Sequence, residues 1–311
     1  MTKSLILHIF AERFTEIMYR IVEKRLLAEG ICLMRVEAPR VAASALPGQF
    51  VMVRADEKGE RIPLTVADYD TVQGTVTIVT QAIGVSTRKI CALNVGESLA
   101  DFAGPLGRPS DFVHETDEAL RGRRYLFVAG GVGTAPVYPQ VKWLHEHGAS
   151  VDVIIGAKSS QMLIYTDEMR AVADNLYIAT DDGSEGFRGL VTDLIKELVE
   201  VRAERYDECV AIGPMIMMKF VARTTKAYSL KTTVSLNALM VDGTGMCGAC
   251  RVTVGGRTRF TCVDGPEFDA HEVDFDEAMR RQGMYRTLEE RANAIAAERA
   301  AGHVCRIGLD K

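Results

Sequence analysis

Three cysteines and one aspartate form the chemically most distinctive pattern in the chain. Their spacing is Asp242-x4-Cys247-x2-Cys250-x11-Cys262. Two-iron, two-sulfide clusters are held by C-x4-C-x2-C and a further distant cysteine, so Asp242 stands where that pattern has its first thiolate. Thiolates are soft ligands that suit iron, and a carboxylate is a harder ligand that also binds it. The spacing predicts a [2Fe-2S] cluster on these four residues; a structural zinc ion or simple buried thiols are the alternatives.

A glycine-rich turn lies between a predicted strand and a predicted helix. It reads Gly130-Gly131-Val132-Gly133-Thr134-Ala135-Pro136. Glycines let the backbone approach a phosphate, and the N–H groups at a helix N-terminus bind one. Pro136 takes the place of the third glycine in the strict dinucleotide fingerprint G-x-G-x-x-G. The turn predicts a phosphate cradle, and a tight strand–helix turn without a ligand is the alternative.

Charged or glycine-containing turns also follow the next three predicted strands. Open α/β sheets bind ligands outside the carboxyl ends of their strands. Lys158 would favour the 2′-phosphate of NADP(H), whereas Asp181 and Asp182 add negative charge near the same crevice. We expect one pyridine-nucleotide site that consists of Gly130, Gly131, Gly133, Thr134, Lys158, Asp181, Asp182, Gly213, Pro214 and Met215.

The elements that position these residues fall into regions of different periodicity. Short alternating runs at 31–37, 49–54 and 75–81 predict a small antiparallel β-barrel over residues 19–110. Residues 120–225 then alternate strands with helices, which predicts a parallel sheet with helices on both faces. The predicted strands are 125–129, 151–155, 176–179 and 208–212, and the predicted helices are 135–146, 166–173 and 190–199. Residues 230–275 are rich in glycine and cysteine, with short strands at 251–254 and 259–262.

The chain is a multidomain α/β and β protein by these patterns. The expected units are an N-terminal extension, a β-barrel, a Rossmann-like α/β nucleotide domain, a small cluster domain and a solvated helical tail, at residues 1–17, 18–116, 117–224, 225–284 and 285–311. The extension is predicted as an amphipathic helix. No histidine or carboxylate pair suggests acid–base catalysis, so no catalytic side chain is expected.

Composition limits the possible functions further. The 311 residues carry 37 Lys and Arg against 42 Asp and Glu, a net charge of −5. That mild acidity argues against nucleic-acid binding, which usually needs a basic patch. No apolar run is long enough to cross a membrane. The first apolar run is too short for a signal peptide, so we expect a cytoplasmic protein.

The order of barrel, glycine-rich α/β domain and two-iron loop resembles the ferredoxin–NADP reductase superfamily. In that superfamily a segment of the form Arg-x-[aromatic or Pro]-x-[Ser/Thr] binds flavin, and a Gly-x-x-Ser/Thr segment holds its pyrophosphate. The matching residues here are Arg61, Pro63, Leu64 and Thr65, then Gly84, Ser86 and Thr87. The resemblance therefore implies bound FAD, with Arg61 as a phosphate partner and Thr65 as a hydrogen-bonding neighbour.

The C-terminal position of the cluster resembles one branch of that superfamily. The branch holds the electron-transfer subunits of dihydroorotate dehydrogenase and the small subunits of NADH-dependent reduced ferredoxin:NADP⁺ oxidoreductases, also called sulfide dehydrogenase beta subunits. Asp242, where the former carry Cys, and the segment Cys262–His271 look like the latter. The resemblance implies electron transfer between NAD(H), FAD and the [2Fe-2S] cluster, and a larger flavin and iron–sulfur partner that uses NADP(H) and ferredoxin in electron bifurcation. Dihydroorotate oxidation, sulfide or polysulfide chemistry, and a non-enzymatic regulator are the alternatives.

Overall fold

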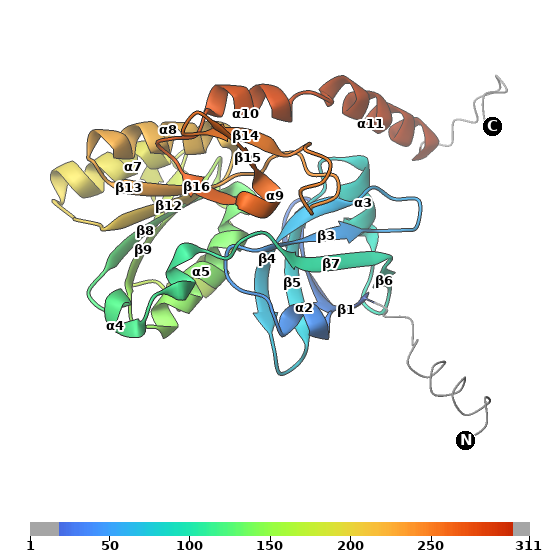
Figure 1. Ribbon diagram of the computed structural model, residues 1–311, viewed down its shortest axis with the longest axis horizontal. Coiled ribbons are helices and arrows are strands. Elements are labelled where there is room, and N and C mark those ends of the chain that lie inside the picture. The colour runs from blue at the N-terminus through green and yellow to red at the C-terminus, as the bar shows by residue number, and fades with distance from the viewer. Residues whose placement is uncertain (1–18, 301–311) are drawn as a thin grey trace.

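The computed structural model describes residues 19–300 (Figure 1). The amphipathic helix predicted at 1–17 and the end of the predicted tail lie outside these residues. The first described unit is a seven-stranded sheet with neighbours in the order β6-β1-β2-β5-β4-β3-β7, all antiparallel. Its strands are β1 (Tyr19–Ala28), β2 (Ile31–Glu37), β3 (Phe50–Arg54), β4 (Ile62–Asp70), β5 (Thr75–Gln81), β6 (Ser98–Leu99) and β7 (Asp101–Leu106).

This sheet is the predicted antiparallel β-barrel, and its core explains the alternating sequence. Met34, Val53 and Ile78 pack together in one buried cluster with Ile21 and Phe102. Side chains of a strand alternate between two faces, so every second residue of these runs enters that core. Two short helices accompany the barrel, α2 (Pro39–Ala42) and α3 (Val85–Ala92).

The second unit is a seven-stranded sheet in the order β11-β10-β9-β8-β12-β13-β16. Its pairings are parallel except that of β16 with β13. The predicted parallel α/β domain is thereby confirmed. The strands are β8 (Arg124–Gly130), β9 (Ser150–Ala157), β10 (Asn175–Thr180), β11 (Phe187–Arg188), β12 (Glu208–Ile212), β13 (Lys231–Ser235) and β16 (Glu267–Asp269).

Helices cover both faces of this sheet, as expected for a Rossmann-like unit. Phe127 packs on one face with α5 (Thr134–Glu146) and α6 (Thr166–Arg170). Leu126 and Val128 pack on the other face with α7 (Val191–Lys196) and α8 (Met215–Ala227). A one-turn π-helix, Glu197–Val201, continues α7. The loop from β7 to β8 contains the 3-10 turn Asp111–His114 and α4 (Asp117–Leu120).

The glycine- and cysteine-rich region is inserted between the last two strands of the second sheet. It contains β14 (Arg251–Val254), β15 (Arg257–Phe260) and α9 (Thr261–Asp264). Cys262 therefore lies on a helical turn rather than on the strand predicted at 259–262, because Asp264 accepts a hydrogen bond of 2.7 Å from the Phe260 N–H and turns the backbone. The domain boundary at residue 225 remains a prediction, although β13 and β16 join the sheet of the preceding unit.

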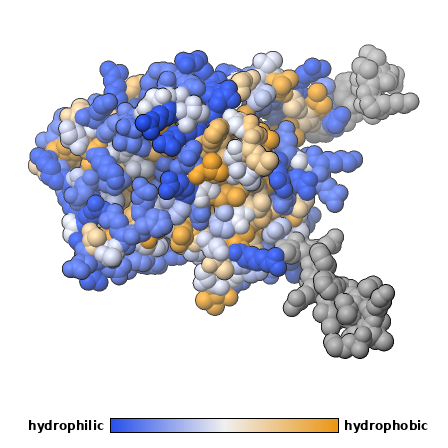
Figure 2. Space-filling model, viewed as in Figure 1, coloured by the Kyte–Doolittle hydropathy of each residue, from blue (hydrophilic) through white to orange (hydrophobic). Residues whose placement is uncertain are grey.

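Two helices, α10 (Phe275–Gln282) and α11 (Arg286–Ala300), follow and lie across one side of the molecule (Figure 1). Most of α11 is exposed, in line with the predicted solvated tail. In Figure 2, apolar surface gathers near the inserted region and again along α11, whereas the side of the second sheet is mostly hydrophilic. Among residues 19–300, no helix is long and apolar enough to cross a bilayer.

Candidate functional site

A cleft of about 1140 Å³ separates the barrel from the carboxyl ends of the parallel strands. The barrel contributes Pro63, Leu64 and Thr65 of β4. The parallel sheet contributes turn residues after β8, β9, β10 and β12 that the sequence places up to 85 positions apart, namely Gly130, Gly131, Gly133, Lys158, Asp181, Gly213, Pro214 and Met215. The structure thus brings together eleven of the residues expected to bind cofactors.

Six of the expected cofactor-binding residues do not line this cleft. They are Arg61, Gly84, Ser86, Thr87, Thr134 and Asp182. Thr134 is buried and donates a hydrogen bond of 2.8 Å to the carbonyl of Gly131, so it shapes the turn from inside. Asp182 is exposed and accepts hydrogen bonds from the N–H and the hydroxyl of Ser184, at 2.9 and 2.6 Å. The two neighbouring aspartates therefore differ: Asp181 faces the cleft and Asp182 closes its own turn.

The glycines of the first turn have two different tasks. A Cβ atom on Gly133 would lie 2.3 Å from the carbonyl oxygen of Ile212, and one on Gly130 would lie 2.4 Å from the Met217 sulfur. These two glycines let the turn after β8 pack directly on the turn after β12. Gly131 has a positive φ of 55° and no atom within 4 Å of such a Cβ. Gly131 is therefore the glycine whose surroundings leave room for a ligand.

The remaining residues of the expected flavin site lie at the edge of the barrel. Arg61 forms an ion pair with Asp101, so its guanidinium is already engaged by a carboxylate. The Ser86 hydroxyl donates to Glu60 at 2.8 Å. The Gly84 N–H donates to the Thr87 hydroxyl at 2.9 Å and caps the start of α3. An anion at this helix N-terminus would have to share these partners.

The four predicted cluster ligands form two pairs. The Cys247 thiol donates to Asp242 Oδ1 at 3.2 Å, and the sulfurs of Cys250 and Cys262 are 3.3 Å apart. No group of three or more metal-binding side chains converges on one point within residues 19–300, as a single zinc ion requires. Two pairs suit a cluster of two irons that each take two protein ligands. The arrangement fits the predicted donor set better than it fits zinc.

Asp242 combines the ligand position with the turn-capping role. Its carboxylate also accepts from the backbone N–H groups of Thr244 and Met246, both at 3.2 Å. Although desolvation opposes it, these hydrogen bonds and that from Cys247 hold the pKa of Asp242 below its ordinary value. The carboxylate is therefore ionised and preset beside the Cys247 sulfur.

One apolar cluster joins the cleft to the cysteine pair. Cys250 and Cys262 are buried with Phe50, Met52 and Met240. Phe50 and Met240 also line the cleft, and Phe50 pairs across the sheet with Thr65. The predicted flavin segment and the predicted cluster ligands are thus separated by side chains of a single packed layer.

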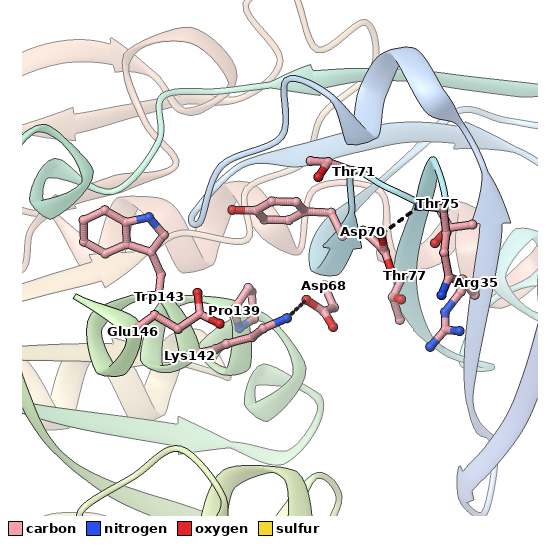
Figure 3. A pocket seen from close by; sticks show the side chains of 12 residues that line it. Arg35, Asp68, Asp70, Thr71, Thr75, Thr77, Pro139, Lys142, Trp143 and Glu146 are labelled. Atoms are coloured by element: carbon pink, nitrogen blue, oxygen red, sulfur yellow. Dashed lines mark hydrogen bonds and ion pairs between the residues drawn. The ribbon is translucent and has the colours of Figure 1, made fainter. Parts of the chain in front are cut away.

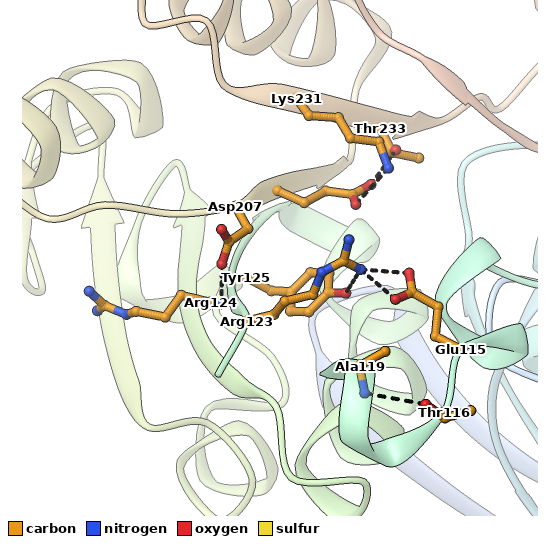
Figure 4. A network of polar contacts seen from close by, with 10 residues as sticks. Glu115, Thr116, Ala119, Arg123, Arg124, Tyr125, Asp207, Lys231 and Thr233 are labelled. Atoms are coloured by element: carbon orange, nitrogen blue, oxygen red, sulfur yellow. Dashed lines mark hydrogen bonds and ion pairs between the residues drawn. The ribbon is translucent and has the colours of Figure 1, made fainter. Parts of the chain in front are cut away.

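Two polar features outside this cleft were not expected from the sequence. A smaller hollow of about 330 Å³ lies between the barrel and α5, where Lys142 Nζ reaches Asp68 at 3.0 Å (Figure 3). At the amino end of β8, Arg123 donates to both oxygens of Glu115 at 2.6 Å (Figure 4). The first ion pair joins segments 74 residues apart and the second spans eight residues of one loop, and neither pair lies within one helix or strand whose period the sequence would indicate.

Glu267 is a third group that sequence reasoning missed. Its Oε1 accepts from the Ser110 hydroxyl at 3.0 Å and from Gln140 Nε2 at 2.8 Å. Burial raises the pKa of Glu267 to about 7. A lone glutamate after a Gly-Pro pair gives no sequence signal for such a contact.

Comparisons with known proteins agree with this geometry. Residues 127–223 match the oxidoreductase NAD-binding domain, and residues 237–274 match the iron–sulfur cluster binding domain of dihydroorotate dehydrogenase B. An uncharacterised protein encoded in the adh 3′ region of Clostridium beijerinckii is 59% identical over 90% of this chain and 95% of its own length. A dihydroorotate dehydrogenase B (NAD⁺) electron transfer subunit homologue of Thermotoga maritima is 44% identical over 87% of this chain and 92% of its own length.

A solved structure is similar over nearly the whole fold. It comes from a study of flavin-based electron bifurcation by the NADH-dependent reduced ferredoxin–NADP oxidoreductase, with a TM-score of 0.83 and 41% identity over 91% of this chain and 99% of that chain. The expected cofactors FAD, [2Fe-2S] and NAD(H) are confirmed by the matched domains and this neighbour. The chain belongs to the family of flavin and iron–sulfur electron-transfer subunits within the ferredoxin–NADP reductase superfamily.

Proposed function

We propose that the chain is the small subunit of an electron-bifurcating oxidoreductase of the NADH-dependent reduced ferredoxin:NADP⁺ type. The packed layer of Phe50, Met240, Cys250 and Cys262 carries this proposal, because it places the cluster ligands directly behind the cleft. Cys250 and Cys262 are buried behind the cleft and Cys247 is exposed, so the cluster would lie between the flavin site and the surface, which suits electron transfer to a partner. The similar solved structure supports the same type of complex.

The nucleotide would lie along the carboxyl ends of β8, β9, β10 and β12. Gly131 leaves the backbone open to a pyrophosphate, and Gly133 and Gly213 hold the two flanking turns together. Lys158 and Asp181 sit farther along the same cleft, where they would contact the adenosine ribose. We infer NAD(H) as the nucleotide chiefly from the resemblance and from the relative named for NAD⁺. Asp181 also disfavours a 2′-phosphate, although Lys158 in the same cleft would attract one.

The flavin would lie against Pro63, Leu64 and Thr65 of β4. Its phosphates would bind Arg61, Gly84, Ser86 and Thr87. The Arg61 guanidinium would then have to bind a phosphate beside Asp101 or give up its ion pair with Asp101. Held there, FAD would supply the chemistry that links two-electron hydride exchange with the nicotinamide to one-electron exchange with the cluster. The protein's own side chains orient these groups and exclude water, and we assign no side chain as acid or base.

The electrons need an acceptor beyond this chain. Since the relatives are electron-transfer subunits, a larger subunit is its partner, and we propose that this subunit carries flavin and iron–sulfur clusters and serves ferredoxin and NADP(H). The described cysteines outside the cluster set, Cys32, Cys91 and Cys209, are free thiols, which suits a reducing compartment, so we place the complex in the cytoplasm. Nothing in the charge pattern suggests a nucleic-acid partner.

Purification of the native complex tests the proposal. We expect the chain to copurify with one larger flavoprotein, and ferredoxin reduction by NADPH to depend strictly on NAD⁺. Relatives named for dihydroorotate dehydrogenase B support a second candidate, an electron-transfer subunit for dihydroorotate oxidation. A complex that oxidises dihydroorotate with NAD⁺, and lacks NADPH activity, would establish that candidate instead.

Nucleotide choice can be tested on two adjacent aspartates. Asp181→Ala should raise the rate of flavin reduction by NADPH relative to NADH, because it removes a negative charge from the cleft. Asp182→Ala is the matched control, because Asp182 bonds to Ser184 outside the cleft. Equal effects of the two substitutions, or a wild-type preference for NADPH, would contradict the assignment of NAD(H).

A further inference from the structure

Glu267 lies where the barrel, the second sheet and the cluster region meet. Ser110 comes from the segment that leaves the barrel, Gln140 from α5, and Glu267 from β16 directly after the cluster region. Both partners donate to the same oxygen, at 3.0 and 2.8 Å. One carboxyl group therefore connects three parts of the chain that lie 157 and 127 residues apart in sequence.

The backbone around Glu267 adds two hydrogen bonds to the same contact. The Arg108 N–H donates to the Gly265 carbonyl at 2.7 Å, and the Leu236 N–H donates to the Pro266 carbonyl at 2.9 Å. A Cβ on Gly48 would come within 3.0 Å of Glu267 Oε1, so the barrel leaves no room there. We call these contacts of Gly265, Pro266 and Glu267 the Glu267 junction.

The Glu267 junction is next to both the cofactor cleft and the predicted cluster ligands. Pro266 lines the cofactor cleft, and Cys262 lies one helical turn before Gly265. A change in the junction would therefore shift the cluster ligands relative to the barrel. The distance between two redox centres controls how fast an electron passes between them, so the junction bears directly on electron transfer.

The charges around Glu267 disfavour its ionised form. Asp111 on the barrel side and Glu208 at the start of β12 are the charged groups that act on it, and both are negative. Glu208 is itself paired with Lys231 at 2.8 Å. Within residues 19–300, Glu267 forms no ion pair, and only neutral donors face it. An unpaired buried carboxylate is costly, whereas a neutral acid is not.

The side-chain carbonyl of Gln140 offers an acceptor for a proton carried by Glu267. Its Nε2 donates to Glu267, but its buried Oε1 finds no donor among the described residues. A buried carbonyl without a donor is itself unfavourable. A protonated Glu267, which already accepts from Nε2 of the same amide, would supply that donor and complete an acid–amide pair.

We propose that Glu267, as a neutral carboxylic acid, is the positioning residue that holds the flavin barrel, the nucleotide sheet and the cluster region together, and that loss of its proton loosens this junction. The proposal rests on the electron-transfer function proposed above. It makes transfer from the flavin to the cluster slower in alkaline solution, although Glu267 itself neither donates nor accepts a proton during that transfer.

Hydrogen exchange tests the junction without any cofactor. The backbone amides of Arg108 and Leu236 should become less protected as the pH rises through neutrality, after correction for intrinsic exchange. Glu267→Gln keeps a neutral amide in place of the acid and should make their protection independent of pH. Asp152→Asn is the control: it neutralises a buried carboxyl at the opposite end of the sheet, whereas Glu267 is partly buried, and it should leave the pH profile unchanged.

The rate of cluster reduction by NADH is the second readout. If the fraction of molecules with an intact junction equals the fraction with protonated Glu267, whose pKa is about 7, the rate of cluster reduction should fall about tenfold between about pH 6 and about pH 8. Glu267→Gln should remain fast at both pH values, and Glu267→Ala should be slow at both. A pH-independent junction in the wild type, or a wild-type profile retained in Glu267→Gln, would overturn the proposal. Loss of NADH activity with a normal exchange profile would instead count against the proposed function alone.

Discussion

Replacing Gly133 by alanine should separate the packing role of the glycine-rich turn from its ligand-binding role. The new Cβ would lie 2.3 Å from the Ile212 carbonyl oxygen and 2.8 Å from the Gly213 Cα. Both obstacles are backbone atoms, so the turns after β8 and β12 must move apart. Overpacking of this kind costs about 3 kcal/mol when no side chain can yield.

Gly131→Ala is the matched control in the same turn. Nothing lies within 4 Å of its added Cβ, and the only penalty is the positive φ of 55°. A left-handed alanine costs about 1 kcal/mol. The two substitutions should therefore differ by about 2 kcal/mol in stability, or roughly thirtyfold in the unfolding equilibrium. Because Gly131 faces open space in the cleft, its substitution should weaken NADH binding and leave the packing of the two turns unchanged.

The single tryptophan of the chain makes the assay direct. Trp143 lies on α5, the helix that this turn begins, so its fluorescence during urea unfolding reports on the affected unit. Titration of the folded variants with NADH measures binding. Equal urea midpoints for Gly133→Ala and Gly131→Ala would refute the reasoning. They would show that a side chain at position 133 causes no steric clash between the two backbone turns.

Three further predictions concern single carboxylates. Asp242→Ala should lose iron and the cluster's share of the visible absorption, and Asp242→Cys should retain both with a shifted redox potential. Asp269→Ala, which removes a similar turn cap outside the loop, should change neither. The free energy of unfolding contributed by Glu267 should fall as the pH rises from about 4.5 to about 7, because the native state holds a proton on Glu267 that the unfolded chain releases. The loss over this range is about 3 kcal/mol. Glu267→Gln should abolish this pH dependence in urea titrations. Asp152→Asn should cost about 3 kcal/mol in thermal or urea unfolding, because the buried Asp152 holds Arg124, Tyr206 and Asn175, whereas Asp167→Asn at an exposed position should cost nothing measurable.

Local periodicity was sufficient to predict most of the elements. The predicted runs 31–37, 75–81 and 208–212 coincide with β2, β5 and β12. In each, alternation or a continuous apolar run reflects burial on one or both faces, which the sequence records directly. Because open α/β sheets bind ligands outside the carboxyl ends of their strands, the turns after four strands were expected to form one site. Most residues of these turns do line one cleft.

The interactions that sequence reasoning missed depend on distant partners. The role of Arg61 as a phosphate partner stays a prediction, but its ion pair with Asp101, forty residues later, could not be read from the sequence. The hydrogen bonds that Glu267 accepts come from residues more than a hundred positions away, so no local sequence pattern predicts them. Cys262 lies on a helical turn because the Asp264 side chain competes for the Phe260 N–H, a local effect that β-propensity alone does not capture.

The cluster region has a topology that limits how it can move. The chain leaves the second sheet at Ser235 and returns beside the same strand at Glu267, with these two residues paired in register. Residues 236–266 are therefore one excursion from a β-hairpin, fastened at both ends to the sheet that binds the nucleotide. A redox module on a single linker must diffuse to its donor, whereas one with both ends fixed stays within reach at every turnover. Leu236, Val252 and Val254 of this excursion pack in the same core as Leu126 and Val128 of the sheet, so the cluster region is anchored by its side chains as well as by its two ends.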